Sequence, residues 1–280
     1  MFLYVKNRIA PRPRYVIGHP VPRPGRYEHF VRTYDAPVMT VPATQDALRA
    51  RRRKKYWYNI DRQKRLFETE IGPLQFEVLG DDPRLGTFLD QVHALFLKRW
   101  SQHFTLAPWR TERGYAPYRA GMLSLVRDGA AELLALHSGG RLLSFGYCLI
   151  AGDGYYFYQH AADPDPRLRR YSLGKILVVE MVRHVVSAGR FRTLDFMIGT
   201  ADYKLEWADR IEPVYYRVSL PRRVWAVPPF IAWSAGAEIW FRLVTNAGLK
   251  ARLRRILESL LALRRRDAKA SAVAPAEEPS

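Results

Sequence analysis

Residues 155–207 read YYFYQHAADPDPRLRRYSLGKILVVEMVRHVVSAGRFRTLDFMIGTADYKLEW, and this stretch decides the fold. We expect a strand at 155–161, a basic loop at 163–172, an apolar helix at 173–188 and a second strand at 191–198. A helix that begins behind a basic, glycine-containing loop can hold a phosphate on its free backbone N–H groups. The second strand leads into a polar cluster, which could act on whatever that phosphate carries.

The helix expected at 173–188 is apolar on almost every side, so it should be buried on more than one side. Ser172 stands at its N-cap position, and a capped helix start can also bind an anion. Gly174 in the first turn is unfavourable by about 1 kcal/mol relative to alanine. Close approach of a ligand would explain this glycine, and Gly189 ends the helix.

The composition indicates a folded protein that needs neither disulfides nor a metal. Hydrophobic residues make up 48% of the 280 residues, which is enough for a core. The single cysteine, Cys148, excludes an internal disulfide framework and suggests a reducing compartment. With no basic neighbour in sequence, it is interpreted as a small buried hydrophobe. Neither His-Glu-x-x-His nor Cys-x-x-Cys occurs, so no metal site is predicted.

The formal net charge of +18 implies attraction to an anionic partner. Nucleic acid, a membrane surface and a phosphorylated ligand all fit, and charge alone does not choose among them. The run Arg51–Lys55 is open to two interpretations: a solvated face beside aromatic packing, or a ridge that faces an anion.

Composition shifts divide the chain into four parts. Residues 1–43 are rich in proline and are interpreted as an extended arm. Residues 44–220 form the expected folded domain. Residues 221–266 form an apolar and basic helical extension, and 267–280 a disordered tail.

Periodicity and turn residues predict the remaining elements of the domain. Helices are expected at 45–69, with Thr44 as N-cap, from Pro83 onward, and at 118–127. Strands are expected at 74–78, 132–137, 141–150 and 213–220.

Three segments carry a resemblance to a known family. The first is a basic helix followed by GPLQFEV at 72–78 and KRW at 98–100. The second is RYSLGKIL at 170–177, and the third is DFxxGxxxYKxxW at 195–207. In this order the three resemble GNAT-fold acyltransferases, in particular the FemAB-like branch that includes the bacterial cellulose-biosynthesis protein CelD. The likeness covers roughly 45–220.

The resemblance implies an α/β (α+β) GNAT fold, with a mixed, mostly antiparallel sheet flanked by helices and a helical C-terminal extension. Members of the family usually carry a first GNAT-like half before the connector helix. In this chain only the proline-rich arm stands in that place.

The family likeness further implies that acyl-CoA, such as acetyl-CoA, is the co-substrate. Its pantetheine would run between the strands at 155–161 and 191–198, and its pyrophosphate would meet the first N–H groups of the helix. The alternative for the arginines is a solvated loop. The implied donor-binding residues are Arg167, Arg169, Arg170, Ser172, Leu173, Gly174 and Lys175.

Acyl transfer to an amine needs a base and groups that stabilise the developing charge. Asp195 is the candidate base or orients the amine, and Lys204 is its partner. The alternative is that these two residues form a structural salt bridge. Tyr203 is a candidate general acid, or simply an aromatic wall. The acceptor side is assigned to Gln159, His160 and Gly199.

The function implied is an N-acyltransferase that moves an acyl group directly from acyl-CoA to an amine, in cell-envelope or exopolysaccharide metabolism. One alternative is an aminoacyl-tRNA-dependent FemAB-like transferase, although no RNA-reading signature is present. Another is a catalytically degenerate binding or scaffold subunit. Filling of the space between the two strands by Tyr156 or Tyr158 would favour that alternative.

The C-terminal region suggests peripheral attachment to a membrane. Residues 249–266 combine an apolar stripe with a basic face, which is typical of an interfacial helix. Tryptophans 225, 233 and 240 precede it, while 224–244 is too interrupted for a membrane span. The alternative is that the stripe packs on the domain. The expected location is the cytoplasm, at the inner face of the plasma membrane.

Overall fold

The computed structural model describes residues 15–17, 21–100 and 112–245. The chain falls into two compact units. One is Asp35–Glu212, and the other combines Met1–Tyr34 with Pro213–Ser280. The predicted helix at 249–266 and the predicted tail lie outside the described residues.

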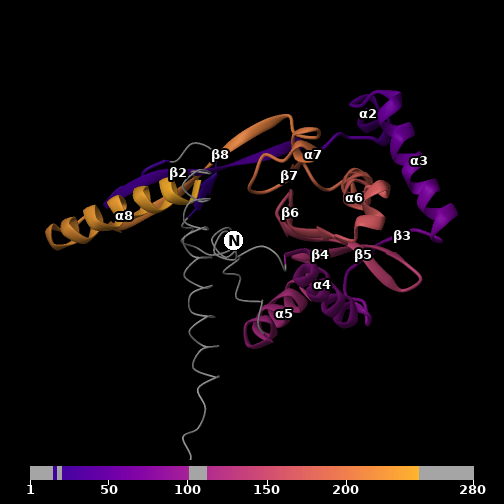
Figure 1. The fold of residues 1–280 in the computed structure, drawn as a ribbon. Coiled ribbons are helices and arrows are strands. Elements are labelled where there is room, and N and C mark those ends of the chain that lie inside the picture. The colour runs from indigo at the N-terminus through magenta and orange to yellow at the C-terminus, as the bar shows by residue number, and fades with distance from the viewer. Residues whose placement is uncertain (1–14, 18–20, 101–111, 246–280) are drawn as a thin grey trace, which may run out of the picture. The chain divides into compact units, whose positions relative to one another are not determined.

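The sheet of the larger unit is mixed and mostly antiparallel, as predicted (Figure 1). Its strand order is β2-β7-β6-β5-β4-β3, and only the pair β6–β7 is parallel. The strands are β2 (Arg26–Thr40), β3 (Gln75–Leu79), β4 (Ala131–Ser138), β5 (Arg141–Ala151), β6 (Gly154–Ala162) and β7 (Thr193–Asp195). β2 begins in the smaller unit and ends in this one.

Helices cover both faces of this sheet (Figure 1). The helices of the unit are α2 (Gln45–Ala50), α3 (Lys54–Glu70), α4 (Leu85–Trp100), α5 (Glu112–Arg127), the 3-10 helix η2 (Pro166–Tyr171), α6 (Leu173–Ala188) and α7 (Asp202–Leu205). Tyr147 and Cys148 are neighbours on β5. The Tyr147 hydroxyl donates to the Met122 carbonyl of α5, whereas the Cys148 sulfur contacts the Met181 sulfur of α6. Successive side chains point to opposite faces of a strand, so α5 and α6 cover opposite faces.

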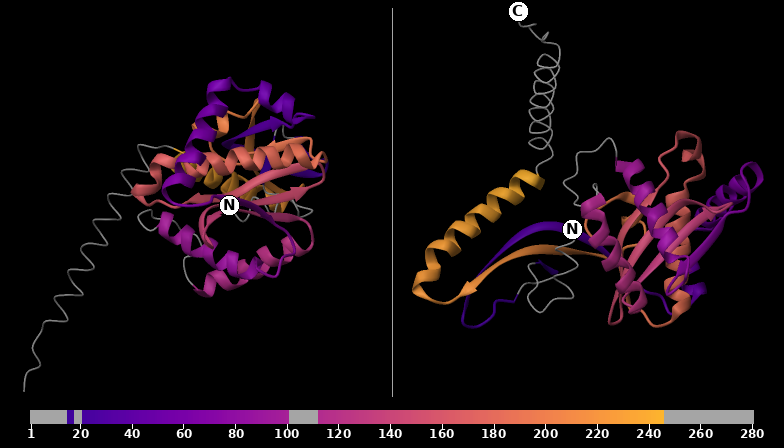
Figure 2. Two further views of the ribbon diagram at one scale, coloured as in Figure 1. Left: turned by 90° about the vertical axis from the view of Figure 1, so that its right-hand side faces the viewer. Right: turned by 90° about the horizontal axis from the view of Figure 1, so that it is seen from below.

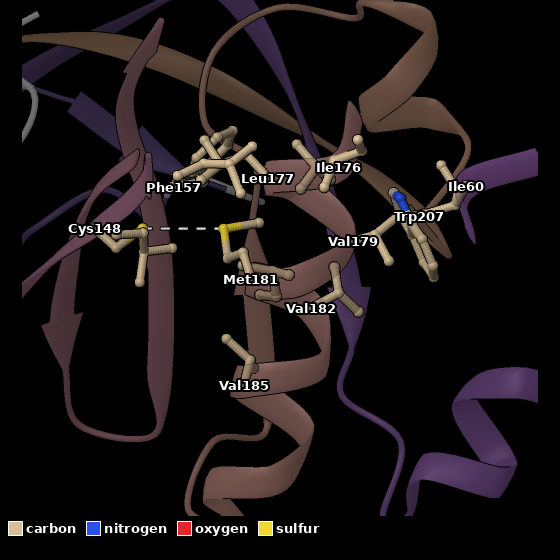
Figure 3. Close-up of a cluster of buried hydrophobic side chains, with 14 of the residues drawn as sticks. Ile60, Cys148, Phe157, Ile176, Leu177, Val179, Met181, Val182, Val185 and Trp207 are labelled. Carbon is tan, nitrogen blue, oxygen red and sulfur yellow. Dashed lines mark hydrogen bonds between the residues drawn. The ribbon is translucent and has the colours of Figure 1, made fainter. Parts of the chain in front are cut away.

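The core of the unit is built around α6, whose bounds match the prediction. Figure 3 shows Cys148 and Phe157 of the sheet on one side of its side chains, and Ile60 and Trp207 on the other. The prediction that this helix is buried on more than one side is therefore confirmed. Gly189 ends the helix with a φ of +66°, as expected for a glycine C-cap.

The helix predicted at 45–69 is two helices, and this part of the prediction is wrong. Thr44 caps the first, since its hydroxyl accepts from the Ala47 N–H at 3.1 Å. The chain is extended at Arg53, with φ −60° and ψ 149°. Arg51 is held at the break by Asp209, at 2.8 Å, and by the Thr40 carbonyl. No glycine or proline marks this break, so only tertiary contacts decide it.

Several other predicted elements are confirmed. The apolar face predicted to follow Pro83 is the buried face of α4, and α5 extends the predicted helix toward its N-terminus. The three strands of the meander pair as consecutive hairpins. Gly139 and Gly152 adopt positive φ in their turns, which is the conformation that tight hairpins need.

The interpretation of 1–43 as an arm outside the domain is corrected. Its described part contains β1 (Tyr15–Ile17) and the 15-residue strand β2. The prolines misled the prediction because most of them precede β2. Pro37 lies within the strand, where it uses its carbonyl to accept from the Phe196 N–H.

In its described residues, the smaller unit combines the strands β1, β8 (Arg210–Pro221) and the first part of β2 with the 3-10 helix η3 (Val224–Ala226) and the helix α8 (Val227–Thr245). The strand order is β1-β8-β2. The rings of α8 pack on the strands: Phe230 on Tyr27, and Phe241 on Tyr34 and Tyr216. In the described residues, no helix is long and apolar enough to cross a membrane.

We predict that Phe67→Ala lowers the free energy of unfolding by about 3–5 kcal/mol. Phe67 is fully buried in α3, and its ring meets the Tyr171 ring edge-on, which ties α3 to η2. Tyr58→Ala in the same helix is the control, because Tyr58 is exposed; its effect should stay within about 0.5 kcal/mol. Urea denaturation followed by circular dichroism measures both variants. Equal effects of the two substitutions would contradict the assignment of Phe67 to the core.

Candidate functional site

The site lies where β6 and β7 separate. The two strands pair at only three positions, from Gly154 with Thr193 to Tyr156 with Asp195. Beyond Asp195 the chain follows β2 instead, since the Phe196 N–H donates to Pro37 and the Gly199 N–H donates to Asp35. The second predicted strand, 191–198, is therefore shorter than expected. After Asp195 the chain no longer pairs with β6, and β6 continues to Ala162 without a partner strand on that side among the described residues.

A β-bulge in β6 determines which side chains face the site. Gln159 pairs with Tyr147 and Tyr156 pairs with Leu149, so β6 carries one extra residue at this point. The extra residue changes the alternation of side chains. Gln159 accepts a hydrogen bond from the Tyr118 hydroxyl of α5, at 2.7 Å. Without the bulge, strict alternation of side chains would have placed Gln159 on the face of the sheet that α6 covers.

His160 instead lies on the side of α6 and α7. Its ring stacks on Phe157, with 4.5 Å between ring centroids, and its Nε2 is 2.7 Å from the Tyr203 hydroxyl. Tyr203 belongs to α7, so this hydrogen bond joins β6 to the segment that follows β7. Two residues predicted for the site from separate segments are thus brought into direct contact.

Burial sets the protonation states of this pair. Burial, together with the smaller effect of the positive charges of Lys204 and Arg99, lowers the pKa of His160 to about 3. Burial also raises the pKa of Tyr203 well above its ordinary value. Near neutral pH the imidazole is therefore uncharged and the phenol keeps its proton. In a neutral His–Tyr pair either group can donate the shared hydrogen bond, and neither buried group has to become charged.

Asp195 and Lys204 are both buried and hold the turn after β7. Asp195 Oδ1 accepts from the Met197 N–H at 2.6 Å, and Met197 has a φ of +62°. Lys204 Nζ donates to the Ile198 carbonyl at 2.8 Å. Burial lowers the pKa of Lys204 to about 8, and the negative charge of Asp195 acts in the opposite direction. The two charges therefore interact, which fits either a structural pair or a catalytic base with its partner.

The start of α6 differs in detail from the expectation. Ser172 has a left-handed backbone, with φ 52° and ψ 43°, and its side chain makes no cap hydrogen bond. Its hydroxyl accepts from Gln63 Nε2 at 3.1 Å instead. The Lys175 N–H donates to the Ser172 carbonyl and is therefore not free for an anion. Within the described residues, the N–H groups of Leu173 and Gly174 have no acceptor.

Neither the backbone nor packing requires glycine at position 174. Its φ is not positive. A Cβ added there would meet only the Ala162 Cβ, at 3.5 Å, which is an ordinary contact. A glycine that costs helix stability without a structural reason leaves room for something to approach the backbone.

The basic side chains around this helix start are not equivalent. Arg167 pairs with Asp165 at 2.7 Å, and Arg170 pairs with Glu70. Arg169 is exposed and has no ion pair with any described residue. Of the three predicted arginines, Arg169 is the one whose charge is not neutralised by an ion pair with a described residue.

Lys175 links the start of α6 to α7. Its Nζ donates to Glu206 at 3.1 Å and lies 4.8 Å from the centre of the Tyr56 ring. The Tyr56 hydroxyl, Gln63 Oε1 and Glu206 Oε2 are buried without a hydrogen-bond partner among the described residues. The sequence alone does not predict Tyr56, Gln63 and Glu206 as site residues. Only Glu206 has a sequence signal: it follows Tyr203 by three residues, which places both on one face of a helix.

We predict that His160 makes stability depend on pH. Between about pH 3 and 6.5 the unfolded state binds a proton at His160 and the folded state does not, so stability is lost as pH falls through this window. His160→Gln removes the titrating group. The loss of unfolding free energy between pH 6.5 and pH 4 should therefore be smaller in the variant. Urea denaturation across this range measures it, and equal pH slopes would contradict a buried neutral His160.

The sequence profile of the acetyltransferase (GNAT) domain family matches residues 50–205. Among curated proteins, no sequence matches the chain significantly.

Solved structures with a similar fold share little sequence. One is the C-terminal domain of a candidate lysylphosphatidylglycerol synthetase from Agrobacterium fabrum, with 13% identity over 80% of this chain and 68% of that one, and a TM-score of 0.48. Another is L-PGS from Bacillus licheniformis, with 11% identity over 74% and 66%, and a TM-score of 0.46. A third is FemX, with 12% identity over 68% and 63%, and a TM-score of 0.48. The chain thus spans about two thirds of the length of these structures.

Proposed function

The chain belongs to the acetyltransferase (GNAT) domain family, and from this premise we propose that it is an N-acyltransferase that moves an acyl group from acyl-CoA to an amine. The observation that carries the proposal is the separation of β6 from β7 beside the start of α6. A thioester arm can lie between the diverging strands while its pyrophosphate meets the helix N-terminus.

The residues at the start of α6 fit a pyrophosphate. The N–H groups of Leu173 and Gly174 have no acceptor among the described residues, and they stand where the helix dipole favours negative charge. Arg169 supplies a cation without an ion pair in the described chain. Gly174 lets the ligand approach the backbone closely. We assign no N–H donation to Lys175, whose N–H is already bonded.

The reaction forms a C–N bond and breaks a C–S bond. The amine nitrogen attacks the thioester carbonyl carbon, the tetrahedral intermediate collapses, and CoA leaves as a thiolate. The proton lost by the amine and the proton gained by sulfur balance, so no further reactant is needed. The protein has to orient the amine, stabilise the oxyanion and deliver a proton to sulfur.

Tyr203 is the proposed proton donor to sulfur. Its raised pKa keeps the phenol protonated, and His160 holds the hydroxyl from β6. Asp195 is the proposed base or orients the amine, with Lys204 as the neighbour that compensates its charge. Gln159, His160 and Gly199 remain the proposed acceptor side. Of these, Gln159 faces Tyr118, so it acts from the α5 face of the sheet.

Direct transfer without a covalent enzyme intermediate is supported by Cys148. This residue is the only cysteine of the chain. It is fully buried against Met181, and burial raises its pKa well above the ordinary value. A thiol that stays protonated and inaccessible is a poor nucleophile.

We further propose an acceptor from cell-envelope or exopolysaccharide metabolism, encountered at the inner face of the plasma membrane. The FemAB-like motifs at 170–177 and 195–207 and the net charge of +18 support this. Precursors of such polymers are commonly linked to phosphate, which a basic protein attracts.

The structure bears unequally on the alternatives. The case for an aminoacyl-tRNA donor rests partly on the basic run Arg51–Lys55, which would attract RNA. Arg51 pairs with Asp209, and Arg52 lies over the Trp207 ring at 5.0 Å, so only the last three basic side chains of the run stay exposed. The scaffold alternative requires Tyr156 or Tyr158 to fill the space between the two strands. Tyr158 packs on Tyr147 instead.

We predict that Gly174→Ala separates folding from ligand binding. Alanine should raise the free energy of unfolding by up to about 1 kcal/mol. The new Cβ should weaken binding of CoA about tenfold, or about 1.4 kcal/mol, as measured by isothermal titration. Gly121→Ala in α5 is the control, because a Cβ there meets nothing within 4 Å. If wild-type protein does not bind CoA, or if Gly174→Ala binds it as tightly as wild type does, the donor site is wrong.

We also predict that Tyr203→Phe lowers turnover by about 10²–10⁴-fold while CoA affinity changes little. Asp195→Asn should behave similarly, because an asparagine oxygen can still accept from the Met197 N–H while the charge is lost. Release of free thiol from acetyl-CoA, with an amine acceptor, measures turnover. Unchanged turnover in either variant would assign that residue to structure alone.

A further inference from the structure

Helix α8 turns an apolar face to solvent. One side of the helix packs on the strands of the smaller unit through Phe230 and Phe241. On the other side large side chains are exposed: Ile231 (61%), Trp233 (63%), Ile239 (59%) and Trp240 (58%). Over its 19 residues the helix carries only two charged side chains, Glu238 and Arg242.

These exposed side chains form one continuous surface. At about 100° per residue they span about 200° of the helix circumference. The positions between them are also exposed and small: Ala232, Ala235 and Gly236. Soluble monomers rarely expose contiguous apolar surfaces of this kind unless something binds there. Residues 231–240 of α8 are named the α8 face below.

Positive charge predominates around the α8 face. The described residues of the smaller unit contain seven arginines and two glutamates. Glu28 is buried and bonded to Arg23, and Glu238 pairs with His29 and Arg242. Arg222 and Arg223 are exposed just before the helix, beside the exposed Trp225.

We propose that the α8 face docks on an anionic lipid bilayer, with the helix lying in the plane of the interface. Tryptophans at one edge of an apolar face suit the boundary between headgroups and acyl chains. Exposed arginines beside that face attract anionic headgroups. Two copies of this chain joined by the same face would bring two arginine-rich units together, which charge repulsion opposes.

The α8 face is a different lipid contact from the one predicted from the sequence. The stripe at 249–266 lies outside the described residues, whereas the α8 face precedes it and is exposed. Docking through α8 needs no acyl transfer, so it stands or fails separately from the proposed function.

The test is co-sedimentation of the full chain with lipid vesicles. The vesicles are phosphatidylcholine alone, or phosphatidylcholine mixed with phosphatidylglycerol. We expect binding to the mixed vesicles only. The double variant Trp233→Ser/Trp240→Ser should bind them at least about tenfold more weakly. The matched control is Tyr58→Ser/Ile71→Ser, which removes two similarly exposed apolar side chains of the larger unit and should bind as wild type does.

A charge variant provides a second measurement if the tryptophan variant is misfolded by circular dichroism. Arg222→Gln/Arg223→Gln leaves the α8 face intact and should also weaken binding to the mixed vesicles. Wild-type binding by a folded tryptophan variant, or by the charge variant, would overturn the proposal. So would a dimer in sedimentation velocity that only the tryptophan variant loses, since a second copy would then occupy the face.

Discussion

Burial of α6 on two sides is the constraint on which the larger unit depends. Met181 and its neighbours face the sheet through Cys148 and Phe157, while Ile60 and Trp207 cover the helix from the other side. A helix that is apolar all round cannot leave one face in water. Its coverage therefore requires both the sheet and the segments around α3 and α7. The same packing positions the first turn of α6 beside the end of β6, where the proposed donor site begins.

Four buried polar residues around the end of β7 are tolerated because each has a partner that offsets its burial. Asp195 and Lys204 form hydrogen bonds with backbone groups of the turn after β7, and their opposite charges lie close enough to interact. His160 and Tyr203 stay neutral and satisfy one another. Burying such groups without partners would cost several kcal/mol. The arrangement thus places the Tyr203 hydroxyl and the Asp195 carboxylate beside the diverging strands without an isolated buried charge.

In the smaller unit, α8 lies along the strands β2 and β8 (Figure 2). These strands bury one side of α8 through Phe230 and Phe241 and leave the opposite side apolar and exposed. Hydrophobic surface of this extent lowers solubility unless it has an occupant. The surrounding arginines favour an anionic partner for this surface. Part of the net charge of +18 therefore lies beside the exposed apolar side of α8.

Local patterns were sufficient for the elements whose period and caps are strong. The bounds of α6, the hairpins of the meander and the buried face of α4 follow from periodicity and turn glycines. The motifs at 170–177 and 195–207 identified the family and most of the proposed site residues. Tertiary structure alone decided the break at Arg53, the bulge that turns Gln159 toward Tyr118, and the pairing of His160 with Tyr203. It also placed β2 in the sheet despite Pro37. These features depend on contacts between residues far apart in the chain, and no local period records such contacts.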